Sequence, residues 1–176
     1  NKTIYCQICT FTVEMAIYEV FKKKNIRLNA VAGFSLGEYS ALVAAEIIDI
    51  KTAFELVNAR ARAMENEVCD NIGNMVAIIN LDIEKVEAIC KKFGAGKVAI
   101  ANYNSFNQIV VSVNKEIFDE FMSGVKSANG RAILLKVSRP FHHPMMKPAA
   151  DKFKANLDGV LFKEPILPIY MNVTGE

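Results

Sequence analysis

The stretch Val31–Leu42, VAGFSLGEYSAL, places one serine between two glycines, with an apolar run before it and an alanine- and leucine-rich run after it. The apolar run Leu28–Gly33 predicts a strand buried on both faces, and Leu36–Ile48 predicts a helix. A G-x-S-x-G sequence between a strand and a helix forms a sharp turn that exposes the serine side chain above the sheet. We therefore expect an α/β fold in which Ser35 occupies such a turn.

The order of elements changes after Met75. From there to Val137 the apolar runs and turn residues predict strand, helix, strand, strand, helix, strand, which is the order of a split βαβ or ferredoxin-like unit. We expect an α/β-hydrolase-like core with a parallel sheet, formed by residues 1–74 and 137–176, and an inserted ferredoxin-like subdomain at residues 75–136. The core is expected to contain further helices at Thr3–Lys24, Lys51–Glu67 and Met145–Leu157, and a strand at Pro165–Val173.

Composition narrows the class of protein. The 176 residues are 52% hydrophobic and 23% charged, which predicts a sizeable buried core. A net charge of +2 argues against nucleic acid as a partner. The chain has no run of eighteen apolar residues and no secretory leader, so we expect a soluble cytoplasmic protein with no membrane partner. It begins without methionine and ends after a strand-like run, so we expect that it is truncated at both ends.

The cysteines give one further motif. Cys6 and Cys9 form a C-x-x-C, while Cys69 and Cys90 stand alone. A C-x-x-C can serve redox chemistry or form half of a zinc site. Neither a second C-x-x-C nor a histidine cluster is present to complete a metal site. We therefore expect no metal, and interpret the pair as two small apolar residues in a buried helix.

A serine hydroxyl is a poor nucleophile until a base removes its proton. The chain has two histidines, His142 and His143, both in the proline-bracketed loop 138–144. If Ser35 is a nucleophile, the base is one of these two, and we favour His142. The alternative is an ordinary pair of surface histidines. The Leu36 amide, at the start of the predicted helix, is placed to bind a developing oxyanion.

Arg60 belongs to the predicted helix Lys51–Glu67. A guanidinium that faces a pocket can bind a carboxylate through two parallel hydrogen bonds. The alternative is an arginine exposed on the surface of the helix.

Four blocks in order carry a resemblance to a known family: GFSLGEYSALVAAEIIDI, LVNARARAM, NYNSFNQIVVS and VSRPFHHPMMKPAADKF. Together they resemble malonyl-CoA:acyl carrier protein transacylases and the related acyltransferase domains of fatty acid and polyketide synthases. The resemblance implies malonyl transfer from malonyl-CoA to an acyl carrier protein. It implies no cofactor, because the phosphopantetheine thiol is carried by the partner. The chain could also be part of a larger synthase.

The resemblance also implies roles for single residues. Ser35 would accept the acyl group, His142 would be its base, Leu36 would supply an oxyanion-hole amide, and Arg60 would bind the malonyl carboxylate. Four further positions would lie at the substrate pocket, with the last favouring malonyl over methylmalonyl groups: Gln7, Asn104, Gln108 and Phe141. Three lysines could dock the acidic carrier: Lys147, Lys152 and Lys154.

Two positions depart from the family pattern. Phe34 stands where the family usually has histidine, and Arg139 stands where its loop often has glycine. Two other functions stay open. A serine esterase or thioesterase of the α/β-hydrolase type would use the same turn but release the acyl group to water. A carrier-binding scaffold without catalysis would keep the lysines and need neither Ser35 nor His142.

Overall fold

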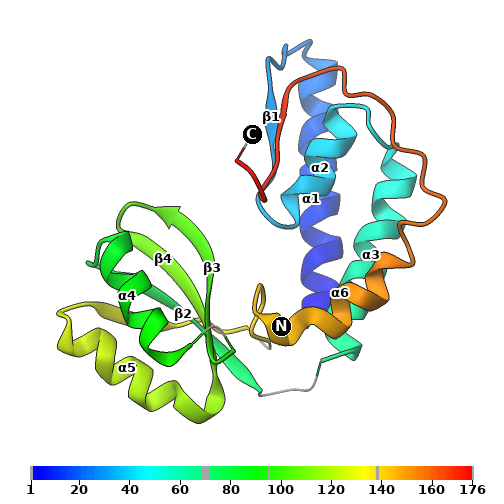
Figure 1. Ribbon diagram of the computed structural model, residues 1–176. Helices are drawn as coiled ribbons and strands as arrows, with labels where there is room; N and C mark the ends of the chain where they lie inside the picture. Colours follow the sequence, from blue (N-terminus) through cyan, green and yellow to red (C-terminus); the bar gives the residue numbers. More distant parts are fainter. Residues whose placement is uncertain (1, 69–71, 95, 138, 176) are drawn as a thin grey trace. The chain divides into compact units, whose positions relative to one another are not determined.

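The computed structural model describes residues 2–68, 72–94, 96–137 and 139–175 (Figure 1). These residues form two compact units, one of residues 66–150 and one of residues 2–65 and 151–175. The first contains an antiparallel sheet and the second a parallel pair of strands, and helices accompany both. The expected α/β class is therefore confirmed.

The unit of residues 66–150 follows the expected order of elements (green to yellow in Figure 1). Its strands lie in the order β3-β4-β2-β5, and every neighbouring pair is antiparallel. Both α4 and α5 contribute to one apolar cluster with the sheet, so they cover the same face of it. The bounds are β2 (Gly73–Ile79), α4 (Ile83–Phe93), β3 (Val98–Ser105), β4 (Gln108–Asn114), α5 (Phe118–Ser127) and β5 (Arg131–Leu134).

Local side chains set where the helices of this unit begin. The Asp82 carboxylate accepts a hydrogen bond from the Lys85 amide at 2.9 Å, which caps the first turn of α4. The Asn114 side chain accepts from the Glu116 amide at 2.8 Å and starts a short 3₁₀ turn, Lys115–Ile117, before α5. Such caps satisfy amides that a helix N-terminus leaves without a partner.

The second unit contains four helices and two short strands among its described residues. β1 runs parallel to β6, with Val31 opposite Ile169, and the core lies among α1, α3 and the residues that follow α2. Helices α3 and α6 each run past a boundary between the two units. The bounds are α1 (Thr3–Lys23), β1 (Val31–Ala32), α2 (Gly37–Ala44), α3 (Ile50–Asn66), α6 (Lys147–Lys154) and β6 (Ile169–Tyr170).

Helix α1 buries a narrower stripe than its apolar pattern indicates, although Phe11 and Met15 of that pattern are buried as expected. Every fourth residue is buried: Thr3, Gln7, Phe11 and Met15. Ile17, which the apolar spacing places on the core face, is 52% exposed. Cys6 and Cys9 are exposed, so the interpretation that they lie in a buried helix is wrong. Cys69 lies outside the described residues.

Helix α1 is also the one described helix long and apolar enough to cross a membrane. This is weak evidence for a membrane-spanning segment, because the core helix of a soluble protein meets the same criteria of length and composition.

Helix α2 ends four residues before the predicted end at Ile48. Glu46 adopts a left-handed conformation with φ of 58°. Its amide donates to the Val43 carbonyl, and the Ile47 amide donates to the Leu42 carbonyl, each at 3.0 Å. This is the Schellman pattern that usually needs glycine. No glycine marks the position, so the sequence pattern continues past the true end.

Three further elements of this unit are also shorter than predicted. The expected strands Leu28–Gly33 and Pro165–Val173 reduce to β1 and β6, and the expected helix Met145–Leu157 reduces to α6 after a 3₁₀ turn, Pro144–Met146. The prediction of a strand buried on both faces is also wrong, because Val31 is half-buried and Ala32 is exposed. Within the described residues β1 pairs only with β6, which leaves much of its surface uncovered.

Candidate active site

The turn between β1 and α2 is tight and strained. Ser35 has φ of 52°, a left-handed conformation that costs a residue other than glycine about 1–3 kcal/mol. A Cβ on Gly33 would lie 2.1 Å from the Gly37 carbonyl carbon, so only glycine fits there. A Cβ on Gly37 would meet nothing within 4 Å. The first glycine of the motif therefore permits the close approach.

The turn leaves one amide open beside the serine. The Gly37 amide donates to the Phe34 carbonyl at 3.0 Å, and the Glu38 amide donates to the Ser35 carbonyl at 3.3 Å. Among the described residues no group accepts a hydrogen bond from the Leu36 amide. This amide precedes the first residue of α2, where helix geometry favours anionic groups.

Arg60, on α3, reaches the serine. Its Nη2 donates to Ser35 Oγ at 3.0 Å, and its Nη1 donates to Gln7 Oε1. Gln7 is 6% exposed, and its Nε2 donates to Thr3 Oγ1 at 3.0 Å. The Gln7 amide is therefore held at both ends, which fixes the direction of the Arg60 guanidinium. The structure brings together three of the predicted site residues here.

The environment of Arg60 suits an anionic ligand. Burial lowers the pKa of its guanidinium, an effect that Tyr39 and Glu38 oppose. The guanidinium carbon lies 5.9 Å from the centre of the Tyr39 ring. Within the described residues no carboxylate forms an ion pair with Arg60, and Glu38 acts on it only from a greater distance. A buried cation without a counter-ion is costly, and a ligand carboxylate would relieve that cost.

Asn172, in the loop that follows β6, is a site residue that the sequence patterns missed. Its Oδ1 accepts from the Ser35 amide at 3.1 Å, and its Nδ2 donates to the Gly33 carbonyl. Two hydrogen bonds of about 0.5–1.5 kcal/mol each are comparable with the strain at Ser35. The residues are 137 positions apart, and no local signal connects them.

The histidine loop, described here from 139 to 144, packs on the sheet of its own unit, that of residues 66–150. Pro140 packs against Gly73 of β2, where an added Cβ would lie 2.9 Å from the proline Cβ. Ser112 Oγ donates to the Phe141 carbonyl at 2.5 Å. The Phe141 ring packs against Met75 and its neighbours, on the face of the sheet that the helices leave open. These contacts give the loop a defined support.

The two histidines differ in their surroundings. His142 is exposed and has φ of 58°. His143 is 3% exposed, its Nδ1 accepts from the Met145 amide at 3.1 Å, and burial lowers its pKa. His143 therefore caps the 3₁₀ turn that precedes α6. These differences agree with the choice of His142 as the base, which stays a prediction.

Asn104 and Gln108, at the adjoining ends of β3 and β4, are both exposed, and Asn104 Nδ2 donates to Gln108 Oε1 at 3.3 Å. Their proposed place at a substrate pocket stays a prediction. Of the two departures from the family pattern, Phe34 is 59% exposed and Arg139 is 4% exposed. The three lysines proposed to dock a carrier are exposed: Lys147, Lys152 and Lys154.

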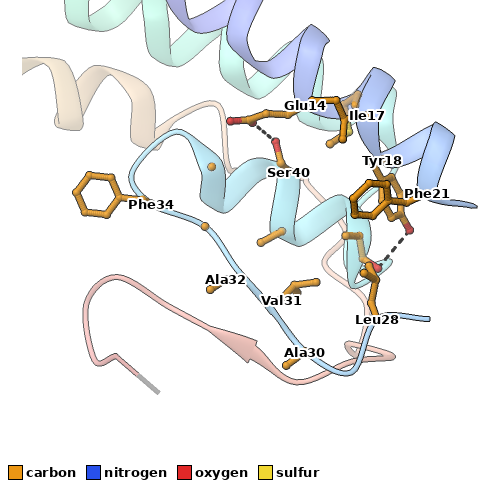
Figure 2. A pocket seen from close by; sticks show the side chains of 15 residues that line it. Glu14, Ile17, Tyr18, Phe21, Leu28, Ala30, Val31, Ala32, Phe34 and Ser40 are labelled. Atoms are coloured by element: carbon orange, nitrogen blue, oxygen red, sulfur yellow. Dashed lines mark hydrogen bonds between the residues drawn. The ribbon is translucent and has the colours of Figure 1, made fainter. Parts of the chain in front are cut away.

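A groove of about 510 Å³ lies among α1, β1 and α2 (Figure 2). Its lining is largely apolar, and at one end it reaches Gly33 and Phe34 of the turn. Figure 2 shows its two internal hydrogen bonds, from the Ser40 hydroxyl to Glu14 and from the Tyr18 hydroxyl to the Ala44 carbonyl. No cluster of three or more potential metal ligands occurs in the described part of the chain.

Comparison with known proteins shows the family of the chain. The family model for the acyl transferase domain matches residues 1–176. The malonyl CoA-acyl carrier protein transacylase of Escherichia coli strain K12 is 39% identical over 176 residues, which cover 98% of this chain and 57% of the relative. The transacylase of Bacillus subtilis strain 168 is 38% identical, with coverage of 99% and 56%.

Solved structures give the same result. The malonyl CoA-acyl carrier protein transacylase of Clostridium perfringens superposes with a TM-score of 0.95 at 37% identity, over 100% of this chain and 56% of the other. A malonyl-transacylase in complex with its type II polyketide synthase acyl-carrier protein superposes with a TM-score of 0.94 at 39% identity, over 100% and 58%. The chain thus spans little more than half the length of these relatives. The family model matches the whole chain and these relatives are 37–39% identical over nearly all of it, so this protein belongs to the acyl transferase domain family.

Proposed function

We propose that the chain carries the acyl-accepting centre of an S-malonyltransferase, which moves malonyl from malonyl-CoA to the phosphopantetheine thiol of an acyl carrier protein. The observation that carries the proposal is the hydrogen bond of 3.0 Å between Arg60 Nη2 and Ser35 Oγ. It places a cation that lacks a carboxylate partner among the described residues at the atom that would carry the acyl group. A malonyl ester on Ser35 ends in the free carboxylate that such a cation binds.

The proposed reaction consists of two half-reactions. Ser35 Oγ attacks the thioester carbon of malonyl-CoA while His142 takes the hydroxyl proton, and the Leu36 amide stabilises the oxyanion. The carbon–sulfur bond then breaks, and the CoA sulfur leaves with the proton from His142. In the second half the carrier thiol attacks the ester, His142 again accepts and returns the proton, and Ser35 is regenerated.

Arg60 accounts for the choice of acyl group. A malonyl carboxylate can receive two parallel hydrogen bonds from the guanidinium, whereas an acetyl group leaves the cation unpaired. Gln7 keeps the guanidinium in place through its bond to Nη1. Phe141 would crowd a methyl group on the α-carbon, and a difference of one methyl group is worth about 1–3 kcal/mol in a hydrophobic pocket. Selection against methylmalonyl should therefore be partial.

Finer features of fold and setting belong to the same proposal. The β1–turn–α2 unit supports an α/β-hydrolase-like core, and the strand order β3-β4-β2-β5 supports a ferredoxin-like subdomain. The bounds 1–74 with 137–176, and 75–136, stay predictions. The exposed lysines of α6 would meet the acidic carrier, in a cytoplasmic enzyme that stands alone or within a larger synthase.

The test is an intact-mass experiment on the natural polypeptide in its full length. The protein is mixed separately with malonyl-CoA and acetyl-CoA, and Ser35→Ala, Arg60→Ala and the control Arg62→Ala are treated in parallel. Arg62 is exposed and bonds to half-buried Asn58 on the same helix, so its loss should leave the reaction unchanged. We expect one malonyl group on the wild type and on Arg62→Ala, none on Ser35→Ala, and a shift from malonyl toward acetyl on Arg60→Ala.

Other results would assign another function. Release of CoA without any adduct, undiminished in Arg60→Ala, would indicate a serine hydrolase that passes the acyl group to water. Neither adduct nor CoA release, with carrier binding retained, would indicate a scaffold without catalysis.

A further inference from the structure

The loop that follows β6 holds both sides of the serine turn. Asn172 Oδ1 accepts from the Ser35 amide at 3.1 Å, while Asn172 Nδ2 donates to the Gly33 carbonyl. These two groups belong to the peptide units on either side of Phe34, the outermost residue of the turn. We propose that Asn172 is a positioning residue for the nucleophile, which keeps Ser35 in its left-handed conformation and so directs the hydroxyl into the reaction.

The conformation of Ser35 explains why such support is needed. Its φ of 52° is unfavourable for a residue with a side chain, and a turn without support would relax toward negative φ. Relaxation would rotate the Cα–Cβ bond and carry Oγ away from Arg60 Nη2, which now lies 3.0 Å from it. β1, the strand before the turn, has only two residues and offers little restraint of its own.

The chemistry of the bridge requires an asparagine. A primary amide presents an acceptor and a donor at the same short reach, which matches the amide on one side of the turn and the carbonyl on the other. A carboxylate in place of the Asn172 amide would keep the bond to Ser35 but would face the Gly33 carbonyl with a second acceptor.

Glu38 holds Asn172 in turn. The Asn172 backbone amide donates to Glu38 Oε1 at 2.8 Å, and Glu38 lies in the first turn of α2, three residues after Ser35. The serine turn, the start of the helix and the loop after β6 therefore close a ring of hydrogen bonds. A glutamine at position 38 would still offer an oxygen to the Asn172 amide, whereas alanine would not.

The same ring of hydrogen bonds gives the Ser35 and Leu36 amides different roles. The Ser35 amide is engaged by Asn172, and the Leu36 amide has no acceptor among the described residues. Asn172 thus leaves the Leu36 amide as the one that meets an anionic oxygen.

The inference rests on the proposed acyl transfer, and the experiment separates the two. In the full-length protein we would compare Asn172→Ala, Asn172→Asp, Glu38→Ala and Glu38→Gln, with Asn58→Ala as the matched control. Asn58 also accepts a side-chain hydrogen bond in the same unit, from Arg62 Nε at 3.2 Å, but lies outside the ring. The measurements are the rate constant for malonylation of Ser35 and the malonyl-CoA concentration that gives half of the maximal rate.

We expect both Asn172 variants to slow malonylation about 10–100-fold, with the half-saturating concentration changed less than about threefold, because Arg60 and Gln7 are untouched. Glu38→Ala should lower the rate about tenfold, and Glu38→Gln should restore it to within about threefold of wild type. Asn58→Ala should match wild type. Asn172 variants that malonylate at the wild-type rate would overturn the proposal.

Hydrogen exchange gives a second readout that needs no acyl transfer. The Ser35 amide should exchange faster in Asn172→Ala and at the wild-type rate in Asn58→Ala. If the wild type forms no malonyl adduct, the proposed function fails, and the exchange rate of the Ser35 amide alone decides the positioning role. Unchanged exchange in Asn172→Ala would refute it.

Discussion

The unit of residues 66–150 and the unit that carries Ser35 support their functional residues by different forces. In the first, an apolar cluster joins a four-stranded sheet to α4 and α5. Pro140 and Phe141 of the histidine loop pack against the same sheet. In the second, the parallel strands are two residues long, and polar bonds from Asn172 and Arg60 hold the serine. The comparison teaches that substitutions should affect mainly stability where packing supports the site, and mainly rate where hydrogen bonds do.

The two adjacent histidines give the strongest test of this distinction between effects on stability and effects on rate. His142→Ala should lower the rate of malonyl transfer about 10²–10⁴-fold, because a general base is lost, while its exposed position leaves stability nearly unchanged. His143→Ala should do the reverse, because it removes a buried cap, and lower the free energy of unfolding by about 1–3 kcal/mol. Steady-state kinetics and urea unfolding of both variants measure this. A large loss of rate in His143→Ala alone would reverse the assignment.

Arg60→Lys sharpens the polar side of the comparison. Lysine keeps the positive charge but loses the planar pair of donors, so malonylation should slow about 10–100-fold. Acetylation should not slow, because an acetyl group has no carboxylate to bind. The ratio of rates with malonyl-CoA and acetyl-CoA is the measurement, and Arg62→Lys is the control. Equal slowing with both substrates would show that Arg60 acts on the serine rather than on the malonyl carboxylate.

The two glycines of the motif differ in how closely other atoms approach them, so alanine substitutions at these positions should have different effects on stability. In Gly33→Ala the new Cβ would meet the Gly37 backbone at 2.1 Å, so we expect a loss of about 1–3 kcal/mol or more in the free energy of unfolding. Gly37→Ala meets open space at the first residue of α2 and should be neutral, or stabilising by up to about 1 kcal/mol. Urea denaturation tests both, and equal losses would contradict the role given to Gly33.

The smallest expected effect is a pH dependence in the packed unit. Burial lowers the pKa of His143, so the unfolded chain binds its proton more readily than the folded chain. The stability from neutral His143 is therefore present above the ordinary histidine pKa of about 6.5 and is lost as pH falls toward the lower folded value. His143→Asn keeps a capping oxygen without this titration. Unfolding free energies from pH 7 to 5 should decline less in this variant than in wild type.

Much of the fold and part of the site follow from local patterns. Residues such as Asp82 and Asn114 favour helix starts, because their side chains cap amides only two or three residues away. The turn at Ser35 follows from a motif of five residues, since the close approach of Gly33 to Gly37 is itself local. The end of α2 could not be predicted, because Glu46 takes a conformation that its side chain does not favour.

The sequence by itself determined the α/β class, the order of elements in residues 66–150 and the sharp turn at Ser35, because periodicity, caps and short motifs act over a few residues. The tertiary structure alone decided that polar Thr3 and Gln7 share the buried stripe of α1, that Gln7 holds Arg60, and that Asn172 bridges the serine turn. Gln7 and Arg60 are 53 positions apart, and Asn172 and Ser35 are 137 apart. Such bonds depend on where packing brings distant segments, and a single amide or guanidinium leaves no periodic signal in the chain.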